Sequence, residues 1–166
     1  QGAKKFDNLF SKDLIKLSRK FKIKVYHQIS DQNLKKVKNF YVSNNVNFQV
    51  FSYTDKLYKI IKKSDFVITR SGASTINELV FLRSPFLAIP YPFAKDDHQF
   101  FNAKYYMNKN FCWLIRETDI KENFLYNFIK NLIKNKKLIF QKKKNMQNFH
   151  RHYDWNESSK QLNNLI

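Results

Sequence analysis

Small and polar residues with the types and spacing to bind a phosphorylated sugar gather within residues 64–103. A run of small residues there would let backbone N–H groups approach a phosphate or a sugar closely. The run consists of Ser71, Gly72, Ala73, Ser74 and Thr75. Glu78 follows about one helical turn later, where a carboxylate can accept hydrogen bonds from the hydroxyls of a ribose. His98 and Gln99 come further along and offer hydrogen bonds to sugar hydroxyls.

The same residues also fit structural roles. Thr75 and Glu78 match the capping box Ser/Thr-x-x-Glu, in which both side chains bond to the start of their own helix. The small residues fit an ordinary loop between a strand and a helix, with a hydroxyl as the cap. Asp97 fits a helix cap that leaves His98 and Gln99 solvated. From the residues alone, both interpretations stay open at each position.

Metal and nucleophile chemistry find less support in the sequence. Cys112 is the single cysteine, so neither a disulfide framework nor a cysteine-based zinc site is expected. No second ligand cluster accompanies His98, and we expect no metal and no cofactor. His27 reads as a packing residue within a strand. The chain has no P-loop, no G-x-S-x-G and no complete G-x-G-x-x-G motif.

The elements that must position the candidate residues can be read from hydrophobic periodicity. The pattern predicts a buried strand at 66–69, a helix at 76–81 that Pro85 ends, a strand at 86–89 and a helix at 98–108. The small residues then lie between the carboxyl end of a strand and the start of a helix. Open α/β sheets bind ligands at that position, and the free N–H groups and dipole of the helix favour phosphate.

The rest of the chain continues this alternation of strands and helices. The pattern predicts helices at 7–20, 31–40 (capped by Asp31), 54–62 (capped by Thr54 or Asp55) and 119–134 (capped by Asp119), and strands at 22–29, 46–51 and 111–115. It indicates an α/β fold, a Rossmann-like three-layer domain with a parallel sheet, over residues 1–134. Residues 135–166 form a basic tail with weaker helix candidates at 140–149 and 156–166.

The charge balance admits three interpretations. The chain of 166 residues carries 31 Lys and Arg against 13 Asp and Glu, a formal net charge of +18. Such a balance suits nucleic acid or an anionic membrane surface, but A/T-rich codon usage also yields many Lys and few Gly. Residues 64–103 have three basic and four acidic residues, so this segment does not share the excess of basic residues found in the rest of the chain.

The order and spacing of these motifs resemble the C-terminal domain of glycosyltransferase family 28, the MurG-type transferases. The family pattern is AD-x-V, RSGA-x-T-x-x-E, P-x-x-x-x-P and D-x-Q-x-x-NA. The matching residues are Asp65, Arg70 to Ala73, Thr75, Glu78, Pro85, Pro90, Asp97, Gln99, Asn102 and Ala103. Gln1 and Gly2 are similar to the end of the family's GGSQGA loop, so we expect the chain to be the C-terminal part of a longer polypeptide. The resemblance extends from residue 1 to about residue 133.

The resemblance implies one half of a GT-B glycosyltransferase, the half that binds UDP-N-acetylglucosamine. By resemblance, Glu78 would hold the ribose hydroxyls, and the backbone from Ser71 to Thr75 would face the diphosphate and sugar. His98 and Gln99 would contact the sugar hydroxyls. Thr54 would read uracil through its backbone, although the family usually has Pro-Phe-Ile where this chain has residues 52–54.

The same resemblance implies the reaction and its setting. The enzyme would be an inverting N-acetylglucosaminyltransferase of peptidoglycan synthesis, converting lipid I to lipid II on the inner face of the bacterial plasma membrane. The lipid-linked muramyl-pentapeptide acceptor would bind through an N-terminal domain, so this segment alone would bind donor weakly and not turn over. No nucleic-acid partner is expected. The alternatives are a basic Rossmann-like module that binds nucleic acid or membrane without catalysis, and a related GT-B transferase with another acceptor.

Overall fold

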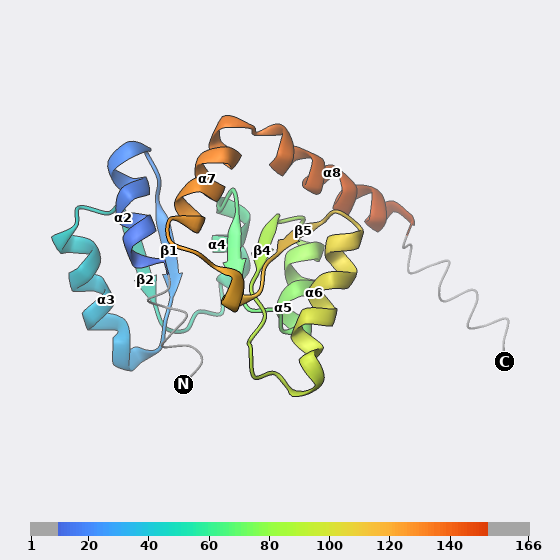
Figure 1. The fold of residues 1–166 in the computed structure, drawn as a ribbon, viewed down its shortest axis with the longest axis horizontal. Coiled ribbons are helices and arrows are strands. Elements are labelled where there is room, and N and C mark those ends of the chain that lie inside the picture. The colour runs from blue at the N-terminus through green and yellow to red at the C-terminus, as the bar shows by residue number, and fades with distance from the viewer. Residues whose placement is uncertain (1–9, 153–166) are drawn as a thin grey trace, which may run out of the picture. The chain divides into compact units, whose positions relative to one another are not determined.

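The computed structural model describes the backbone of residues 10–152, in which strands and helices alternate along the chain (Figure 1). Every strand pair is parallel. The chain divides into two compact units, one combining the residues up to Ile60 with Ile120–Asn135, the other combining Ile61–Asp119 with the residues from Lys136 onward. Among the described residues, no helix has the length and apolar character needed to cross a membrane.

The first unit contains a two-stranded parallel sheet, β1 (Val25–Gln28) and β2 (Phe48–Phe51). Its helices are α2 (Ser11–Lys20), α3 (Asp31–Ser43) and α7 (Phe124–Lys134), and it holds the start of α4 (Leu57–Lys63). The Tyr41 side chain is buried, and its hydroxyl lies 3.0 Å from Nδ1 of His27. His27 is therefore a packing residue within a strand, as the sequence predicts.

A buried carboxylate ties α2 to the start of α7. Asp13 on α2 is 7% exposed, and its Oδ2 accepts hydrogen bonds from the backbone N–H groups of Leu125 (2.9 Å) and Tyr126 (3.2 Å). The cap residue of α7, Asn123, supplies no side-chain cap of its own. A negative charge at a helix N-terminus also interacts favourably with the helix dipole. Asp13 therefore caps α7, the role that the sequence analysis predicted for Asp119.

Two predicted caps are wrong for the same reason: the helix begins elsewhere. Asp119 lies in a short 3-10 helix, η2 (Glu117–Asp119), and α7 begins only at Phe124. Asp31 is the first residue of α3 rather than its cap, and the cap position belongs to Ser30, whose side chain makes no capping bond. Because a cap contact depends on a backbone angle at one residue, periodicity alone does not locate it.

The second unit contains a three-stranded parallel sheet in the order β3 (Val67–Thr69), β4 (Phe86–Ala88), β5 (Cys112–Leu114). Its helices are α5 (Ala73–Phe81), α6 (His98–Asn108) and α8 (Lys137–His152), with a 3-10 helix, η1 (Lys95–Asp97), before α6. All three residues of β4 are buried, as expected for the central strand. Helix α5 ends at Phe81, ahead of Pro85, because Arg83 adopts a left-handed backbone with φ of 54°.

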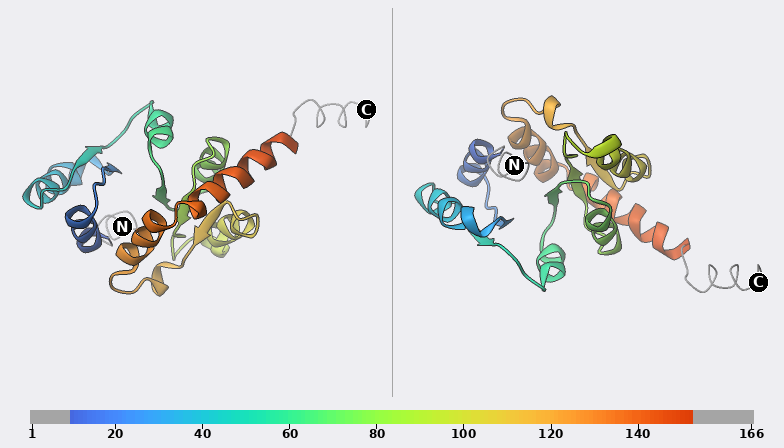
Figure 2. Two further views of the ribbon diagram at one scale, coloured as in Figure 1. Left: turned by 90° about the horizontal axis from the view of Figure 1, so that it is seen from above. Right: turned by 90° about the horizontal axis from the view of Figure 1, so that it is seen from below.

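Helix α8 is anchored at the end of the sheet where the strands begin. Lys142 on α8 is 6% exposed, and its Nζ donates to Asn110 Oδ1 (2.7 Å) and to the carbonyl of Cys112 (2.9 Å) at the start of β5. Figures 1 and 2 show α8 at this end of the strands. Burial lowers the pKa of Lys142 and raises the pKa of the Cys112 thiol to about 12, so the thiol is neutral at physiological pH.

Replacing Asp13 by Ala is expected to destabilise the chain by roughly 2–3 kcal/mol, because two N–H groups at the buried start of α7 lose their acceptor. The free energy of unfolding in urea measures this loss. Asp31→Ala is the matched control, since Asp31 makes no capping contact, and should cost less than about 0.5 kcal/mol. Equal losses in the two variants would contradict the role of Asp13.

Candidate functional site

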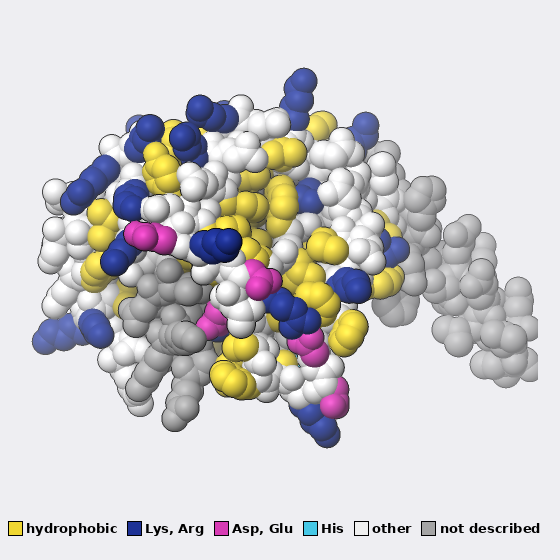
Figure 3. Space-filling view, viewed as in Figure 1, with side chains coloured by type: hydrophobic (Ala, Val, Ile, Leu, Met, Phe, Trp, Pro, Cys, Tyr) yellow, Lys and Arg dark blue, Asp and Glu magenta, His cyan; other side chains and the backbone are white. Residues whose placement is uncertain are grey.

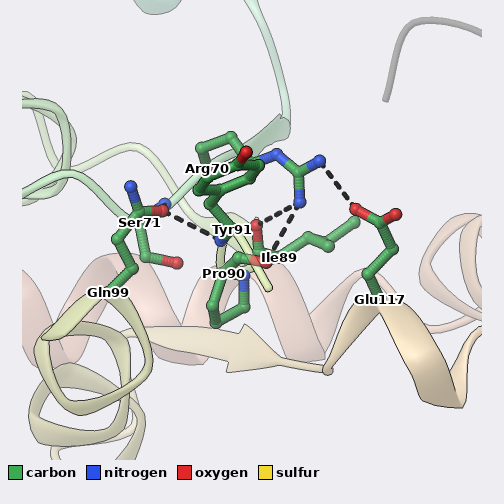
Figure 4. A network of polar contacts seen from close by, with 7 residues as sticks. All are labelled: Arg70, Ser71, Ile89, Pro90, Tyr91, Gln99 and Glu117. Atoms are coloured by element: carbon green, nitrogen blue, oxygen red, sulfur yellow. Dashed lines mark hydrogen bonds and ion pairs between the residues drawn. The ribbon is translucent and has the colours of Figure 1, made fainter. Parts of the chain in front are cut away.

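Polar contacts gather at the carboxyl ends of β3, β4 and β5, where the sequence places the candidate residues (Figure 4). Arg70 and Ser71 directly follow β3, the peptides of Ile89 and Pro90 follow β4, and Glu117 follows β5. These residues lie far apart in the sequence and belong to a single unit of the fold. Together they form the rim from which α5 and α6 start.

The Arg70 side chain links the ends of all three strands. One guanidinium nitrogen, Nη1, donates to the carbonyls of Ile89 (3.3 Å) and Pro90 (3.0 Å). The other, Nη2, pairs with Glu117 Oε2 at 2.6 Å. The Glu117 side chain is only 6% exposed and the Arg70 side chain 22%. The guanidinium suits this position because its planar fork of N–H donors serves several acceptors at once.

Gln99 joins the ends of β3 and β4 from the other side. Its Oε1 accepts hydrogen bonds from the backbone N–H groups of Ser71 (3.2 Å) and Tyr91 (3.0 Å), as Figure 4 shows. Nδ2 of Asn102, one turn later on α6, donates to the carbonyl of Ser71 at 3.4 Å. The Ser71 peptides are therefore held through both their N–H and their carbonyl. The Ser71 N–H is engaged, whereas the N–H groups of Ala73 to Thr75 have no acceptor among residues 10–152.

The N-terminus of α5 has no side-chain cap. Gly72 occupies the cap position with φ of −62° and ψ of 138°, and the first helical bond runs from the N–H of Ile76 to the Gly72 carbonyl at 3.0 Å. The N–H groups of Ala73, Ser74 and Thr75 consequently have no acceptor within the helix. All three residues are exposed. The predicted capping box of Thr75 and Glu78 is wrong, because Thr75 lies inside the first turn and not at the cap.

Space is left open around this helix start. A side-chain carbon built onto Gly72 would meet only Thr75 Oγ1, at 3.9 Å, which is an ordinary contact. Nor does its φ lie in the left-handed region. Neither packing nor backbone conformation within the chain thus requires glycine at this position. What glycine does is leave the uncapped N–H groups accessible.

Glu78 lies on the same face of α5 as the uncapped start of the helix. It comes four residues after Ser74 and three after Thr75, the spacing that places side chains one above another. Helical side chains also tilt toward the N-terminus. Glu78 is half-buried, and within residues 10–152 its carboxylate has no hydrogen-bond or ion-pair partner. This carboxylate is therefore available one turn from the free N–H groups.

His98 is the first residue of α6 and is exposed, with its Nδ1 2.7 Å from the carbonyl of Lys95. The two residues before it, Asp96 and Asp97, have left-handed φ values of 50° and 52°. Asp97 makes no capping bond, contrary to the structural alternative for this motif. Its carboxylate instead pairs with Arg116, at 2.6 and 3.3 Å, and so connects the end of β5 to the start of α6.

The remaining predicted residues lie elsewhere. Thr54 belongs to the first unit, in the loop between β2 and α4, and its Oγ1 accepts a hydrogen bond from the N–H of Lys56 at 3.1 Å. Gln1 and Gly2 lie outside the described residues. The structure therefore brings the segment from Ser71 to Thr75 together with Gln99. It places Glu78 one turn along α5 and His98 next to Gln99 at the start of α6. Thr54 belongs to the other unit.

Sequence reasoning did not find two residues of this rim, Glu117 and Arg116. Neither belongs to a motif. Each pairs with a residue much earlier in the chain, Glu117 with Arg70 and Arg116 with Asp97. In Figure 3, the visible Asp and Glu side chains lie among Lys and Arg side chains. Among the described residues, no group of His, Cys, Asp or Glu is placed to hold a metal ion.

Comparison with known proteins identifies the family. The model of the glycosyltransferase family 28 C-terminal domain matches residues 1–157. The chain belongs to glycosyltransferase family 28. Over its whole length it is 40% identical to the UDP-N-acetylglucosamine–N-acetylmuramyl-(pentapeptide) pyrophosphoryl-undecaprenol N-acetylglucosamine transferase of Pelagibacter ubique, of which it covers 47%. It is 34% identical to the transferase of the same name from Rickettsia bellii and covers 46% of it. The family 28 chain thus spans about half the length of these curated relatives.

Solved structures agree on the fold. The crystal structure of Acinetobacter baumannii MurG matches 85% of this family 28 chain with a TM-score of 0.72 and 21% identity, and the match covers 42% of that protein. The glycosyltransferase VinC, solved in complex with dTDP, matches 81% with a TM-score of 0.58 and 14% identity, over 33% of its length. The predicted Rossmann-like α/β fold is confirmed.

Replacing Arg70 by Met is expected to destabilise this family 28 domain by roughly 3 kcal/mol, because it leaves the Glu117 carboxylate buried without its cation. Arg116→Met is the matched control. Its ion pair with Asp97 is 44% and 35% exposed, and such a pair contributes less than about 1 kcal/mol. Urea unfolding distinguishes the two, and a smaller loss for Arg70→Met than for Arg116→Met would contradict the linking role of Arg70.

Proposed function

We propose that this chain is the donor-binding half of an inverting N-acetylglucosaminyltransferase, and that it binds UDP-N-acetylglucosamine at the carboxyl ends of β3 to β5. The observation that carries the proposal is the uncapped N-terminus of α5 with the Glu78 carboxylate, unpaired within residues 10–152, one turn further on. A nucleoside diphosphate offers phosphate oxygens to the N–H groups and ribose hydroxyls to the carboxylate. The names of the relatives, N-acetylglucosamine transferases that use a UDP donor, support the same donor.

The diphosphate binds at the start of α5. The N–H groups of Gly72 to Thr75 point outward from the helix start, and the helix dipole adds a partial positive charge there. Gly72 keeps the backbone accessible to a phosphate oxygen. The N–H of Ser71 is not one of these donors, because it already donates to Gln99 Oε1.

Glu78 accepts hydrogen bonds from the ribose hydroxyls. A carboxylate is an acceptor only, and its two oxygens match the two neighbouring hydroxyls of a ribose. Its place one turn along α5 from the phosphate groups corresponds to the position of the ribose relative to the diphosphate in the same ligand.

The sugar contacts the start of α6. His98 is exposed at the first position of that helix. Gln99 has its Oε1 committed to the backbone of Ser71 and Tyr91, so its Nε2 is the group that donates to a sugar hydroxyl. Gln99 would thus serve two purposes, holding the ends of β3 and β4 together and presenting its amide nitrogen to the sugar.

In the reaction, the anomeric carbon passes through an oxocarbenium-like state while UDP leaves with growing negative charge. Backbone N–H groups fixed at the start of α5 stabilise that charge without having to reorganise. The acceptor hydroxyl needs a base, which an N-terminal domain would supply together with the site for the lipid-linked muramyl-pentapeptide. The whole enzyme would then convert lipid I to lipid II on the inner face of the plasma membrane.

The ribose assignment predicts a specific loss in Glu78→Ala. The unmodified chain should bind UDP about 10- to 100-fold more tightly than dUDP, because dUDP lacks one hydroxyl that the carboxylate would accept from. Glu78→Ala should bind the two nucleotides equally. Isothermal titration calorimetry measures all four affinities. Glu122→Ala, which removes an exposed carboxylate of the other unit, is the control and should keep the preference for UDP. A preference for UDP that survives in Glu78→Ala would contradict the assignment.

The diphosphate assignment predicts opposite changes in stability and affinity for Gly72→Ser. A serine hydroxyl at the cap position bonds to an N–H of the first turn and should raise the free energy of unfolding by a few tenths of a kcal/mol. The same hydroxyl competes with the phosphate, so affinity for UDP should fall roughly tenfold. Urea unfolding and calorimetry on one preparation separate the two effects. A variant that gains stability and keeps full affinity would show that these N–H groups do not bind the diphosphate.

A further inference from the structure

Phe93 is an exposed aromatic residue at the rim of the candidate site, and the proposed donor contacts make no use of it. It lies in the loop between β4 and α6, which projects from the end of the sheet where the strands finish (Figure 1). It is 82% exposed, more than any other phenylalanine among the described residues. Single exposed apolar residues are common on protein surfaces, so exposure alone indicates no role. The surroundings of Phe93 are what distinguish it.

The ring of Phe93 packs against Tyr91, a residue that is itself fixed at the rim. The two ring centres lie 5.7 Å apart with their planes inclined at 70°, which is an edge-to-face contact. The Tyr91 N–H donates to Gln99 Oε1 at 3.0 Å, and the Tyr91 ring centre lies 5.7 Å from the guanidinium carbon of Arg70 (Figure 4). Phe93 is therefore connected, through Tyr91, to the two residues that link the strand ends.

The backbone of the loop also restricts where Phe93 can lie. The N–H of Ala94 donates to the Tyr91 carbonyl at 3.1 Å, which places Pro92 and Phe93 at the centre of a tight turn. A second bond of 3.1 Å runs from the N–H of Asp97 to the Ala94 carbonyl. The proline ring fixes one backbone angle of the turn. Because the loop is already ordered by these contacts, little conformational freedom remains to be lost when a ligand binds.

Phe93 lies on the side of the site that the proposed function gives to the sugar. Gln99, which holds the Tyr91 N–H, also offers its Nε2 to a sugar hydroxyl in that proposal, and His98 begins the helix that follows the loop. A pyranose ring carries hydroxyls around its edge and apolar C–H groups on its faces. A sugar site therefore combines hydrogen-bonding groups for the edge with an apolar, often aromatic, surface for a face. The start of α6 offers the former, and Phe93 offers the latter.

We infer that the Phe93 ring packs against the apolar face of the N-acetylglucosamine ring of the donor, and that it determines the preference for the nucleotide sugar over the bare nucleotide. The inference rests on the proposed function and adds an apolar contact to its hydrogen bonds. Packing of this kind removes one face of the phenylalanine ring and one face of the sugar from water. UDP has no sugar and gains nothing from it. The contribution of Phe93 therefore lies in the ratio of the two affinities and not in the affinity for UDP.

Isothermal titration calorimetry with UDP-N-acetylglucosamine and with UDP tests this. Phe93→Ala should lower the ratio of the two affinities about fivefold, since covering one face of the ring contributes about half as much as burying it fully. Its affinity for UDP alone should not change. Phe93→Tyr keeps the ring and should keep the ratio. The control Phe81→Ala removes another exposed ring, at the last residue of α5 and away from the rim, and should also keep it.

Proton NMR of the bound nucleotide sugar gives an independent readout. The ring current of Phe93 should move the resonances of the sugar ring protons upfield, and Phe93→Ala should abolish that shift. An unchanged affinity ratio in Phe93→Ala, with UDP still bound, would overturn the inference alone. Equal losses for the two ligands, or the same fall in Phe81→Ala, would overturn it as well, because Phe93 would then not act on the sugar. Absence of UDP binding by the unmodified chain would overturn the proposed function and this inference with it.

Discussion

The arrangement of the candidate site depends on the contacts of a single guanidinium group. Arg70 ends β3, bonds to the peptides that end β4 and pairs with Glu117 beyond β5. Backbone hydrogen bonds join these strand ends, from Ile89 N–H to the Thr69 carbonyl and from Ile115 N–H to the Ala88 carbonyl, and the Arg70 side chain adds to them. The Gln99 amide and the Arg116–Asp97 pair extend the same linkage to α6. The start of α5 is thereby fixed in place before any ligand arrives, which is what a site that stabilises developing charge requires.

Several features of this rim are unfavourable for stability within the chain. Gly72 leaves the start of α5 without the hydroxyl cap that serine would give. Ser71 Oγ is buried without a hydrogen-bond partner among the described residues. Asp96 and Asp97 both adopt left-handed backbone conformations that non-glycine residues rarely take. Unfavourable local conformations of this kind are typical of binding and catalytic sites. Here the linked strand ends hold these residues in place.

The sequence predicted the elements well because they depend on local periodicity. The strand at 66–69, the helix at 98–108 and the turn between strand and helix at Gly72 all follow from spacing of apolar residues and from small residues. The caps assigned to Asp31 and Asp119, and the capping box of Thr75 and Glu78, were wrong. A cap depends on where one residue leaves helical geometry, and the true acceptor for α7, Asp13, comes from a helix at the other end of the sequence. Long-range pairs such as Arg70–Glu117 have no local signature at all.

The central claim is that the linked strand ends hold the start of α5 ready for a diphosphate. Titration of the ¹⁵N-labelled chain with UDP, followed by the chemical shifts of the backbone amides, tests it most directly. The account predicts that the largest shifts fall on Gly72, Ala73, Ser74 and Thr75, with a smaller shift at Ser71, whose N–H Gln99 already occupies. Saturable binding of UDP that leaves the amides of Gly72 to Thr75 unchanged would contradict it.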